Sequence, residues 1–354
     1  MIRLLIFAAL AAIGAAHAAA IGFTVDTLSA PRASGGVNRF PKLIEKGNAA
    51  KAINLFLHSI ELRAKPGGVA KDAFASLPAP TAALDYTVGA NTARLLSIRI
   101  DYRNLDRLAH PQARGWTFDA ASGQPITQSD LFSPEGYGRL RQRVATERVK
   151  RINEVLQAAR AKPADEDLAE TAALYEDCLD TVRGDTLTDD QLFVGSDSLA
   201  LEHGDCASAE YLQYDRLRPL RVELKLADLA ADLNDYGRCL LLGAGSSPCV
   251  NKVKEGPQPG TYGGSIGKRP VTVVFERRYD GDRISGSYVL DRRYHRIEGR
   301  TQRDGKAKLY ETGTTLDDLL CEFTLFTKAD GSIDGTWRSL AENQLQPLAL
   351  KPLR

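Results

Sequence analysis

Histidine close to a carboxylate is the pattern in this chain that is best suited to acid–base chemistry. Four histidines lie beyond the first twenty residues: His58, His110, His203 and His295. His110 stands out because it falls in a predicted loop, in the same region as Asp101 and Asp119. A carboxylate that orients a histidine can make it a general base, as in hydrolases. His110, Asp101 and Asp119 are therefore the catalytic candidates of the sequence.

The sequence lacks the motifs that would assign these residues to a known type of catalytic site. The sequence has no H-E-x-x-H or H-x-H pair for zinc and no G-x-S-x-G turn for a nucleophilic serine. The run 263–268 resembles a phosphate loop but is too short, and Arg269 stands where a magnesium-binding Ser or Thr belongs. We therefore predict no catalytic residue, no metal and no cofactor, and keep a hydrolase that uses His110 as an alternative.

A basic and aromatic stretch near the C-terminus is the predicted binding surface. Eight arginines and four acidic residues lie between positions 277 and 303. Guanidinium groups pair with anionic groups, and tyrosine rings between them suit the stacking of sugars, so an anionic glycan or a lipid headgroup fits this pattern. A solvated strand face would explain it equally well. The residues of this surface are Arg277, Arg292, Arg293, Arg296, Tyr288 and Tyr294.

The overall charge is balanced but unevenly distributed. Residues 19–354 carry 45 basic and 45 acidic side chains, because Arg3 is the only charged residue among the first eighteen. This balance gives no general attraction to nucleic acid, and we expect no such partner. Fifteen carboxylates and one base lie between positions 165 and 215. We interpret this stretch as a solvated face, with docking of a cationic partner as the alternative.

The five cysteines indicate disulfides if the chain is exported. They are Cys178, Cys206, Cys239, Cys249 and Cys321. Four cysteines allow three connectivities, and we prefer the local pairs 178–206 and 239–249. Cys321 is then left over on a predicted strand.

Export is predicted from the N-terminus. Residues 1–18 have a positive start, a short apolar run and a small-x-small exit at Ala16–Ala18, which is typical of a cleaved signal peptide. The apolar run is shorter than the ~20 residues that a membrane span needs. We expect the chain to act in the periplasm or the medium, with no membrane span.

The remaining residues are too many for one ordinary domain. We predict a short segment that leads in, an α+β domain, a linker that carries a disulfide loop, and a β-meander. Their ranges are 19–40, 41–236, 237–259 and 260–354.

The first domain should hold an antiparallel sheet with packed helices. Apolar positions three and four residues apart predict a helix over Ala49–Leu62, and Ser133–Pro134–Glu135 is a good start for a second helix that runs to about Ala161. Further helices are expected over Asp167–Leu179 and Leu226–Leu233. The expected strands are Leu84–Val88, Ala93–Tyr102, Gly115–Phe118, Gln191–Val194, Leu199–His203 and Pro219–Lys225.

For the second domain the sequence predicts eight short strands with tight turns between several of them, a pattern typical of a half-barrel or small barrel. The strands are Tyr262–Ile266, Val271–Tyr279, Ile284–Leu290, His295–Thr301, Ala307–Glu311, Cys321–Thr327, Ile333–Ser339 and Leu345–Lys351.

Residues 41–226 resemble a known family. The motifs are Leu95–Ile98, Ala109–Pro111, Trp116–Asp119, Ser122–Gly123 and Ile126–Phe132. In this order they are similar to the bacterial domain-of-unknown-function family found in lysozyme-sensing extracytoplasmic anti-sigma factors and beside some polysaccharide deacetylase domains. The resemblance implies an α+β domain used for recognition at the cell envelope. Neither the anti-sigma nor the deacetylase role transfers with it.

The sequence therefore predicts a secreted or periplasmic, non-catalytic binding protein of the bacterial cell envelope. Its partner would be a protein, such as a lysozyme-like one, or a glycan. The alternatives are a small-ligand carrier with a lipocalin-like C-terminal barrel and the envelope hydrolase that uses His110. The sequence does not predict an oligomeric state.

Overall fold

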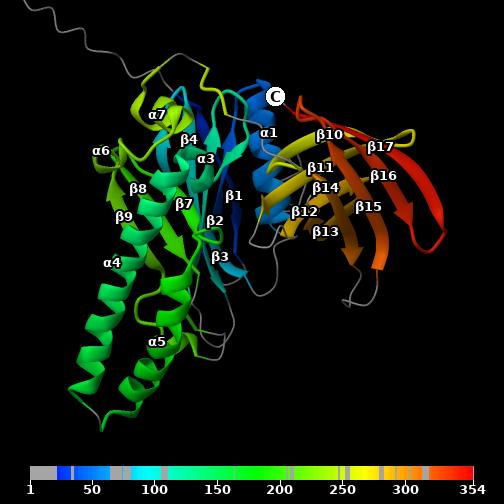
Figure 1. The fold of residues 1–354 in the computed structure, drawn as a ribbon. Helices are drawn as coiled ribbons and strands as arrows, with labels where there is room; N and C mark the ends of the chain where they lie inside the picture. Colours follow the sequence, from blue (N-terminus) through cyan, green and yellow to red (C-terminus); the bar gives the residue numbers. More distant parts are fainter. Residues whose placement is uncertain are drawn as a thin grey trace, which may run out of the picture.

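The computed structural model describes residues 22–32, 36–63, 74, 81–104, 111–162, 164–204, 206–207, 211–245, 248–251, 256–278, 283–291, 293–302, 304–312 and 319–353. The predicted signal peptide lies outside this described part, and so do His110 and Arg292. The backbone of Arg277 is described, but its side chain is not. The described chain is α+β in its N-terminal part and all-β in its C-terminal part, as predicted (Figure 1).

The first two strands of the described residues form a hairpin that the sequence pattern did not predict. Strands β1 (Val25–Pro31) and β2 (Val37–Leu43) pair antiparallel, so the segment assigned as a lead-in, 19–40, carries regular structure. Ala30 is the one fully buried residue of β1. With so little of the strand buried, its sequence lacks the alternation of apolar and polar residues by which strands are recognised.

The first helix lies between the two halves of the molecule (Figure 1). Helix α1 (Asn48–Leu57) continues as a π-helical turn, η1 (His58–Leu62), so the helical segment begins one residue before the predicted range 49–62 and ends with it. Ile53, Phe56 and Leu57 are fully buried, as the spacing of apolar residues predicts. His58 is a buried core histidine whose Nδ1 lies 2.8 Å from the carbonyl oxygen of Asn54. Burial lowers the pKa of His58 to about 4.

Helix α1 packs on a four-stranded antiparallel sheet. Its strands, in spatial order, are β3 (Thr81–Asn91), β4 (Leu95–Asn104), β5 (Pro111–Asp119) and β6 (Pro125–Ile126). Leu96, Ile98 and Ile100 share one face of β4 and enter the same core as α1. Strand β6 pairs only with Thr117 and Phe118, so the rest of that edge of β5 has no strand partner in the described part of the chain.

A three-stranded sheet covers the other face of β4 and β5. It is formed by β7 (Gln191–Val194), β8 (Ser198–His203) and β9 (Leu220–Lys225). The backbone N–H of Val194 donates to Ser97 Oγ (2.9 Å), and Thr117 Oγ1 donates to the Leu192 carbonyl (3.2 Å). Gly115 permits this close approach, because a Cβ there would lie 2.9 Å from the Leu192 carbonyl oxygen.

The remaining helices lie at the outer side of these sheets. They are α3 (Gln128–Leu131), α4 (Pro134–Arg160), α5 (Glu166–Gly184), α6 (Leu226–Leu229) and α7 (Asp235–Leu242), with a short 3₁₀ turn, η2 (Leu212–Tyr214). The Ser133 side chain caps α4 and Pro134 starts it, as predicted. Long helices α4 and α5 pair and project from the molecule (Figure 1).

Among the described residues, none of the helices combines the length and the apolar character that a membrane span requires.

The first domain ends later than expected. The predicted end at residue 236 falls inside α7, which continues to Leu242 within the predicted linker 237–259. Cys239 and Leu240 are buried, and Leu240 packs in the N-terminal core. Gly243, with φ of 70°, ends the helix in the left-handed conformation that glycine adopts freely. The change in composition that marked the boundary begins only after this cap.

The C-terminal domain is a closed, eight-stranded antiparallel barrel. Consecutive strands pair in sequence order, and the last strand pairs with the first, which decides between the predicted half-barrel and barrel. The strands are β10 (Gly260–Ile266), β11 (Arg269–Arg278), β12 (Arg283–Leu290), β13 (Arg293–Thr301), β14 (Lys306–Thr312), β15 (Leu319–Thr327), β16 (Ile333–Ser339) and β17 (Gln344–Pro352). All eight predicted strands are present.

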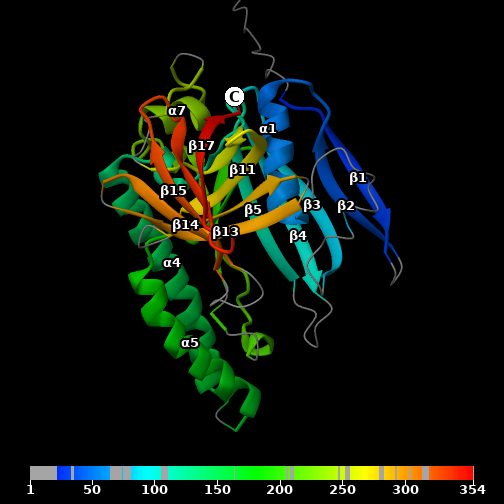
Figure 2. The ribbon, with the colours of Figure 1, turned by 90° about the vertical axis from the view of Figure 1, so that its right-hand side faces the viewer.

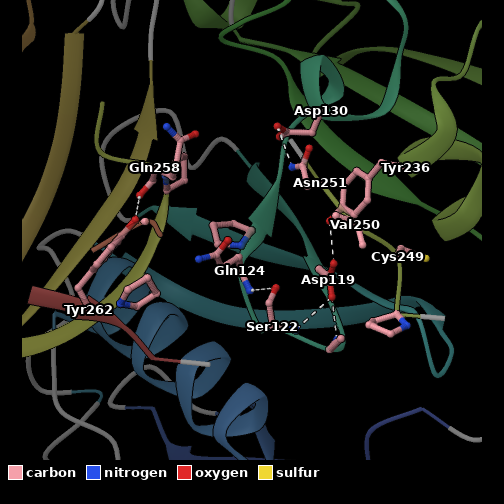
Figure 3. Close-up of a pocket in the computed structure, with 16 residues that line it drawn as sticks. Asp119, Ser122, Gln124, Asp130, Tyr236, Cys249, Val250, Asn251, Gln258 and Tyr262 are labelled. Atoms are coloured by element: carbon pink, nitrogen blue, oxygen red, sulfur yellow. Dashed lines mark hydrogen bonds between the residues drawn. The ribbon is translucent and has the colours of Figure 1, made fainter. Parts of the chain in front are cut away.

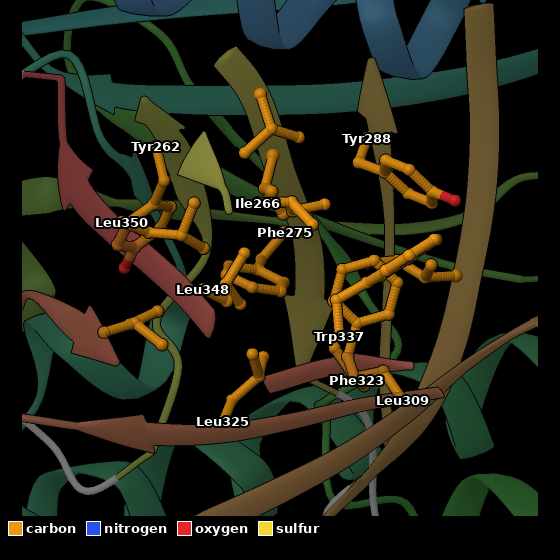
Figure 4. Close-up of a cluster of buried hydrophobic side chains, with 14 of the residues drawn as sticks. Tyr262, Ile266, Phe275, Tyr288, Leu309, Phe323, Leu325, Trp337, Leu348 and Leu350 are labelled. Carbon is orange, nitrogen blue, oxygen red and sulfur yellow. The ribbon is translucent and has the colours of Figure 1, made fainter. Parts of the chain in front are cut away.

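Side chains from every strand pack inside the barrel (Figure 4). Tyr262, Phe275, Phe323 and Trp337 supply much of this packed volume, and each is less than 9% exposed. In barrels of this strand number the interior is just wide enough for side chains to fill it. The packing observed here therefore gives the lipocalin-like carrier no positive support.

The two domains are in direct contact along α1 and η1. Thr261 Oγ1 on β10 donates to the carbonyl oxygen of Ala52 on α1 (3.1 Å), and Val274 on β11 joins the N-terminal core cluster. Arg114 on β5 pairs with Glu276 on β11 (3.3 Å). The barrel thus stands against α1 on the side opposite the β3–β6 sheet (Figures 1 and 2).

Both preferred cysteine pairs are disulfides. Cys178 on α5 is joined to Cys206, and Cys239 on α7 is joined to Cys249 in the linker. Cys321 is a free, buried thiol, as expected. Burial and the Glu311 carboxylate raise the pKa of Cys321 to about 12, so it is a thiol and not a nucleophilic thiolate at neutral pH.

Removing each disulfide should lower the free energy of unfolding by an amount set by its loop. The separations are 28 and 10 residues. The chain-entropy relation gives about 3.5 kcal/mol for the C178S/C206S variant and about 2.5 kcal/mol for C239S/C249S. Urea denaturation of the three proteins measures both values. The wild type in reductant is the control, and an unfolding midpoint that reductant does not move would contradict the pairing.

Candidate functional site

A cleft lined by charged side chains lies between the two N-terminal sheets. Its volume is about 430 Å³, and its walls come from β4 and β5 on one side and from β7, β8 and the segment before β9 on the other. We call it the charged cleft. Its charged lining residues are Arg99, Asp101, Arg114, Asp189, Glu202, His203 and Arg218.

Asp101, a predicted catalytic candidate, lines this cleft. Arg99 Nη1 lies 3.4 Å from Asp101 Oδ1, and burial raises the pKa of Asp101. Arg99 also faces the buried Glu202, with Nε 3.4 Å from Oε1. Because His110 lies outside the described residues, the proposed pairing of Asp101 with His110 stays a prediction.

A buried ion network holds His203 at the wall of the cleft. Arg148 on α4 is completely buried and donates to Asp185 (2.8 Å) and Asp190 (2.5 Å). His203 Nδ1 contacts the same two carboxylates, at 3.2 and 3.1 Å. Burial alone would lower the pKa of His203, but the two aspartates outweigh it and raise the pKa to about 9. His203 is therefore an imidazolium at neutral pH.

Three residues of this network could in principle be metal ligands. The ligand atoms of Asp185, Asp190 and His203 lie within 4.8 Å of one another, a spacing that fits a cation. The guanidinium of Arg148 already holds both carboxylates, and a metal would need His203 to lose its proton. The three residues therefore fit a double ion pair better than a metal.

A second pocket lies where the two domains meet (Figure 3). Its volume is about 420 Å³, and we call it the interdomain pocket. The turn after β5, helices α3 and α7, the linker and the barrel all contribute to it. Its polar and aromatic lining residues are Asp119, Ser122, Gln124, Asp130, Tyr236, Asn251, Gln258 and Tyr262.

Asp119 lines this pocket, but its oxygens are committed to structure. Oδ1 accepts the backbone N–H groups of Ala121 (2.8 Å) and Ser122 (3.1 Å), and Oδ2 accepts the Tyr236 hydroxyl (2.8 Å). Gly123 has φ of 71°. This is the turn that Asp and Gly at these positions favour. Asp119 therefore shapes the pocket by holding the turn and Tyr236 in place.

The charged cleft and the interdomain pocket follow one another along β5. Arg114 lines the cleft, and Asp119 lines the pocket. Between them lies a separate hollow of only about 20 Å³, room for about one water molecule, lined by Gly115, Trp116 and the barrel residue Glu276. At ~3.3 Å per residue, Arg114 and Asp119 are about 17 Å apart along the strand. We call the three hollows together the β5 groove.

The predicted arginine–tyrosine surface is divided by the barrel wall. Tyr288 is almost fully buried inside the barrel, so its place in an exposed binding surface was wrong. Arg293 and Arg296 are exposed, and Tyr294 is partly buried. Successive residues of a strand face opposite sides of a sheet, so Tyr288 cannot join an outward-facing set with Tyr294 and Arg296, whose register puts them on the other face.

Inside the barrel, a polar cluster exists that the sequence analysis missed. The Tyr288 hydroxyl and His295 Nδ1 (2.6 Å) both contact the buried Glu311 carboxylate, and the Tyr288 and His295 rings stack. Burial would raise the pKa of Glu311, but these hydrogen bonds outweigh it and lower the pKa. The residues lie on three strands. Tyr288 is paired with His295, and Glu311 is paired with Ile297, two residues further along the strand of His295, so only the strand register could have linked them.

The His203 ion pair should make stability depend on pH. The folded pKa, about 9, is above the ordinary value of 6.5, so the contribution is complete below pH ~6.5 and is lost as the pH rises through 9. It is on the order of 3 kcal/mol. We expect the difference in unfolding free energy between the wild type and His203→Gln to shrink from pH 6 to pH 9.5. A constant difference in denaturant titrations at these pH values would contradict the ion pair.

No protein-family model matches this chain, and no curated protein matches it. The similarity of residues 41–226 to the envelope-domain family therefore rests on the sequence motifs alone and stays a prediction.

Proposed function

We propose that this chain is a non-catalytic binding protein of the bacterial cell envelope and that it holds a glycan in the interdomain pocket. The observation that carries the proposal is the lining of that pocket. Two tyrosines, two glutamines and an asparagine converge there from both domains and the linker. Amide groups offer donors and acceptors side by side, as sugar hydroxyls require.

The surroundings of the pocket favour a ligand held in place over a reaction. Tyr236 donates to Asp119, and Tyr262 donates to the Gln258 carbonyl (3.1 Å), so both rings are oriented before any ligand arrives. The Cys239–Cys249 disulfide ties the linker to α7 at the rim. Preorganised walls reduce the entropy that binding costs.

The two disulfides support a location outside the cytoplasm, since such bonds persist in oxidising compartments. Periplasmic or secreted placement, and the cleaved signal peptide that would cause it, are part of this proposal.

A cationic, lysozyme-like protein is the second candidate partner, and a different surface favours it. The outer side of α5 exposes a row of carboxylates with one base in the last turn of the helix. The row consists of Glu166, Asp167, Glu170, Glu176, Asp177 and Asp180. Such a field would attract a basic protein and would be sensitive to salt.

Removing amide groups from the interdomain pocket should distinguish between these two candidate partners, because it should weaken the binding of a glycan. Gln124→Ala with Asn251→Ala takes two hydrogen-bonding groups out of the interdomain pocket. At about 1 kcal/mol for each lost contact, the affinity for soluble peptidoglycan fragments should fall about 10- to 30-fold. Isothermal titration calorimetry on the full exported chain measures this change.

The matched control is Gln344→Ala, an exposed amide at the start of β17 that does not line the pocket. It should bind fragments like the wild type. If no fragment binds the wild type, or if the double variant binds as tightly, the glycan proposal fails. Salt-sensitive binding of lysozyme that E176K/D180K abolishes would instead support the α5 surface.

A further inference from the structure

The charged cleft at the other end of the β5 groove carries both signs of charge at its surface. His203 contributes an imidazolium, and Asp101 contributes a carboxylate. A site for a simple anion or a simple cation would present mainly one sign to its ligand. A cleft that presents both is complementary to a ligand that is itself doubly charged.

His203 and Asp101 each have a polar atom that is not used in these ion pairs and that a ligand can contact. Both aspartates of the ion network contact His203 through Nδ1, which leaves Nε2–H as the donor that a ligand can reach. Asp101 is held through Oδ1 by Arg99, at 3.4 Å, and its side chain is 37% exposed. A carboxylate on the ligand therefore finds an imidazolium on a wall that also carries the guanidinium groups of Arg99, Arg114 and Arg218. An ammonium group finds the Asp101 carboxylate.

Both groups are fixed before binding. His203 is only 12% exposed and is clamped by Asp185 and Asp190, which Arg148 holds in turn. Glu202 anchors the floor, with Arg221 Nη1 at 3.0 Å and Arg99 Nε at 3.4 Å. A charge pair that is rigid and partly desolvated binds an opposite pair more strongly than flexible surface side chains do.

We propose that the charged cleft binds an amino-acid zwitterion, with a carboxylate and an ammonium group on neighbouring carbons, as on a free amino acid or on an amino acid attached to a larger ligand through its side chain. The ligand carboxylate pairs with His203, and its ammonium group pairs with Asp101. A cleft of about 430 Å³ is large enough for such a group with a short side chain.

If the interdomain pocket binds a glycan, as proposed above and as this step requires, the charged cleft indicates which kind of glycan it is. A sugar in the interdomain pocket and an amino-acid group in the charged cleft would be separated by the ~17 Å between Asp119 and Arg114 along β5. A ligand that occupied both hollows would then be a glycan whose amino-acid substituent is attached through its side chain, because attachment through the α-amino or α-carboxyl group would remove one of the two charges.

Three small probes test the cleft by itself. Alanine carries both charges, propionate lacks the ammonium group, and ethylamine lacks the carboxylate. Titrating each into the ¹⁵N-labelled exported chain, we expect alanine to shift the amide signals around Asp101 and His203. Propionate and ethylamine should bind at least tenfold more weakly.

Two variants and a control complete the experiment. Asp101→Asn and His203→Gln should each weaken alanine binding at least tenfold. Asp26→Asn is the matched control, because Asp26 is an exposed carboxylate on β1 that does not line the cleft. It should leave alanine binding unchanged. Since His203 also stabilises the fold, Asp101→Asn decides the result if His203→Gln does not fold.

The outcomes separate this inference from the glycan proposal. Alanine that binds no better than propionate, or that binds equally to Asp101→Asn, overturns the zwitterion site. Alanine binding that depends on Asp101, in a protein that binds no peptidoglycan fragment, leaves the zwitterion site standing and removes the glycan. Fragment binding that the Asp101→Asn variant retains in full removes the link between the two hollows.

Discussion

The position of α1 between two β-structures is the constraint on which the rest of the molecule depends. Its large apolar residues, such as Ile53 and Phe56, pack toward the β3–β6 sheet, and its small residues, such as Ala52, let the barrel approach closely. A helix that is buried on two sides cannot leave either partner without exposing apolar surface to water. The interdomain pocket and the hollow beside Glu276 both take their shape from this packing, because each is lined by residues of both domains.

The π-helical turn that extends α1 adds a polar connection to the same junction. Glu61 in η1 accepts hydrogen bonds from the Tyr102 hydroxyl (2.6 Å) and from Trp116 Nε1 (2.5 Å), so it ties the helix to β4 and β5. Burial raises the pKa of Glu61. Arg114 lies between Glu61 (3.9 Å) and Glu276 on the barrel (3.3 Å). One arginine thus links the sheet, the helix and the barrel, and it also stands in the wall of the charged cleft.

Local signals in the sequence were sufficient for most of the fold. The cap at Ser133, the even spacing of the barrel strands and the two local cysteine pairs are all features of neighbouring residues, and the structure confirms them. The β1–β2 hairpin was missed because so little of β1 is buried. The predicted linker starts at residue 237 so that it holds the whole Cys239–Cys249 loop, but Cys239 lies on α7, which packs into the N-terminal core.

The candidate site was less predictable because it is assembled from distant parts of the chain. Asp101 and Asp119 were recognised by type, and Arg99 lies two residues from Asp101 on the same face of β4. Glu202, which Arg99 also faces, and Tyr236, which lies 117 residues from Asp119, come from distant parts of the chain. The acidic stretch illustrates the same limit. It was interpreted as a solvated face, which holds for the exposed side of α5, while Asp185, Asp190 and Glu202 turn inward to pair with arginines.

Those inward carboxylates explain why one stretch of sequence can serve two purposes. A carboxylate on the outer side of α5 is hydrated and shielded by salt, so it can only act on a partner at long range. Asp190, which is completely buried, forms ion pairs with both Arg148 and His203 and so fixes their positions. Net charge along the sequence therefore says little about the charge a ligand would meet. In the charged cleft that charge is decided by which arginine reaches which acid, and His203 faces the ligand as a cation within the most acidic segment of the chain.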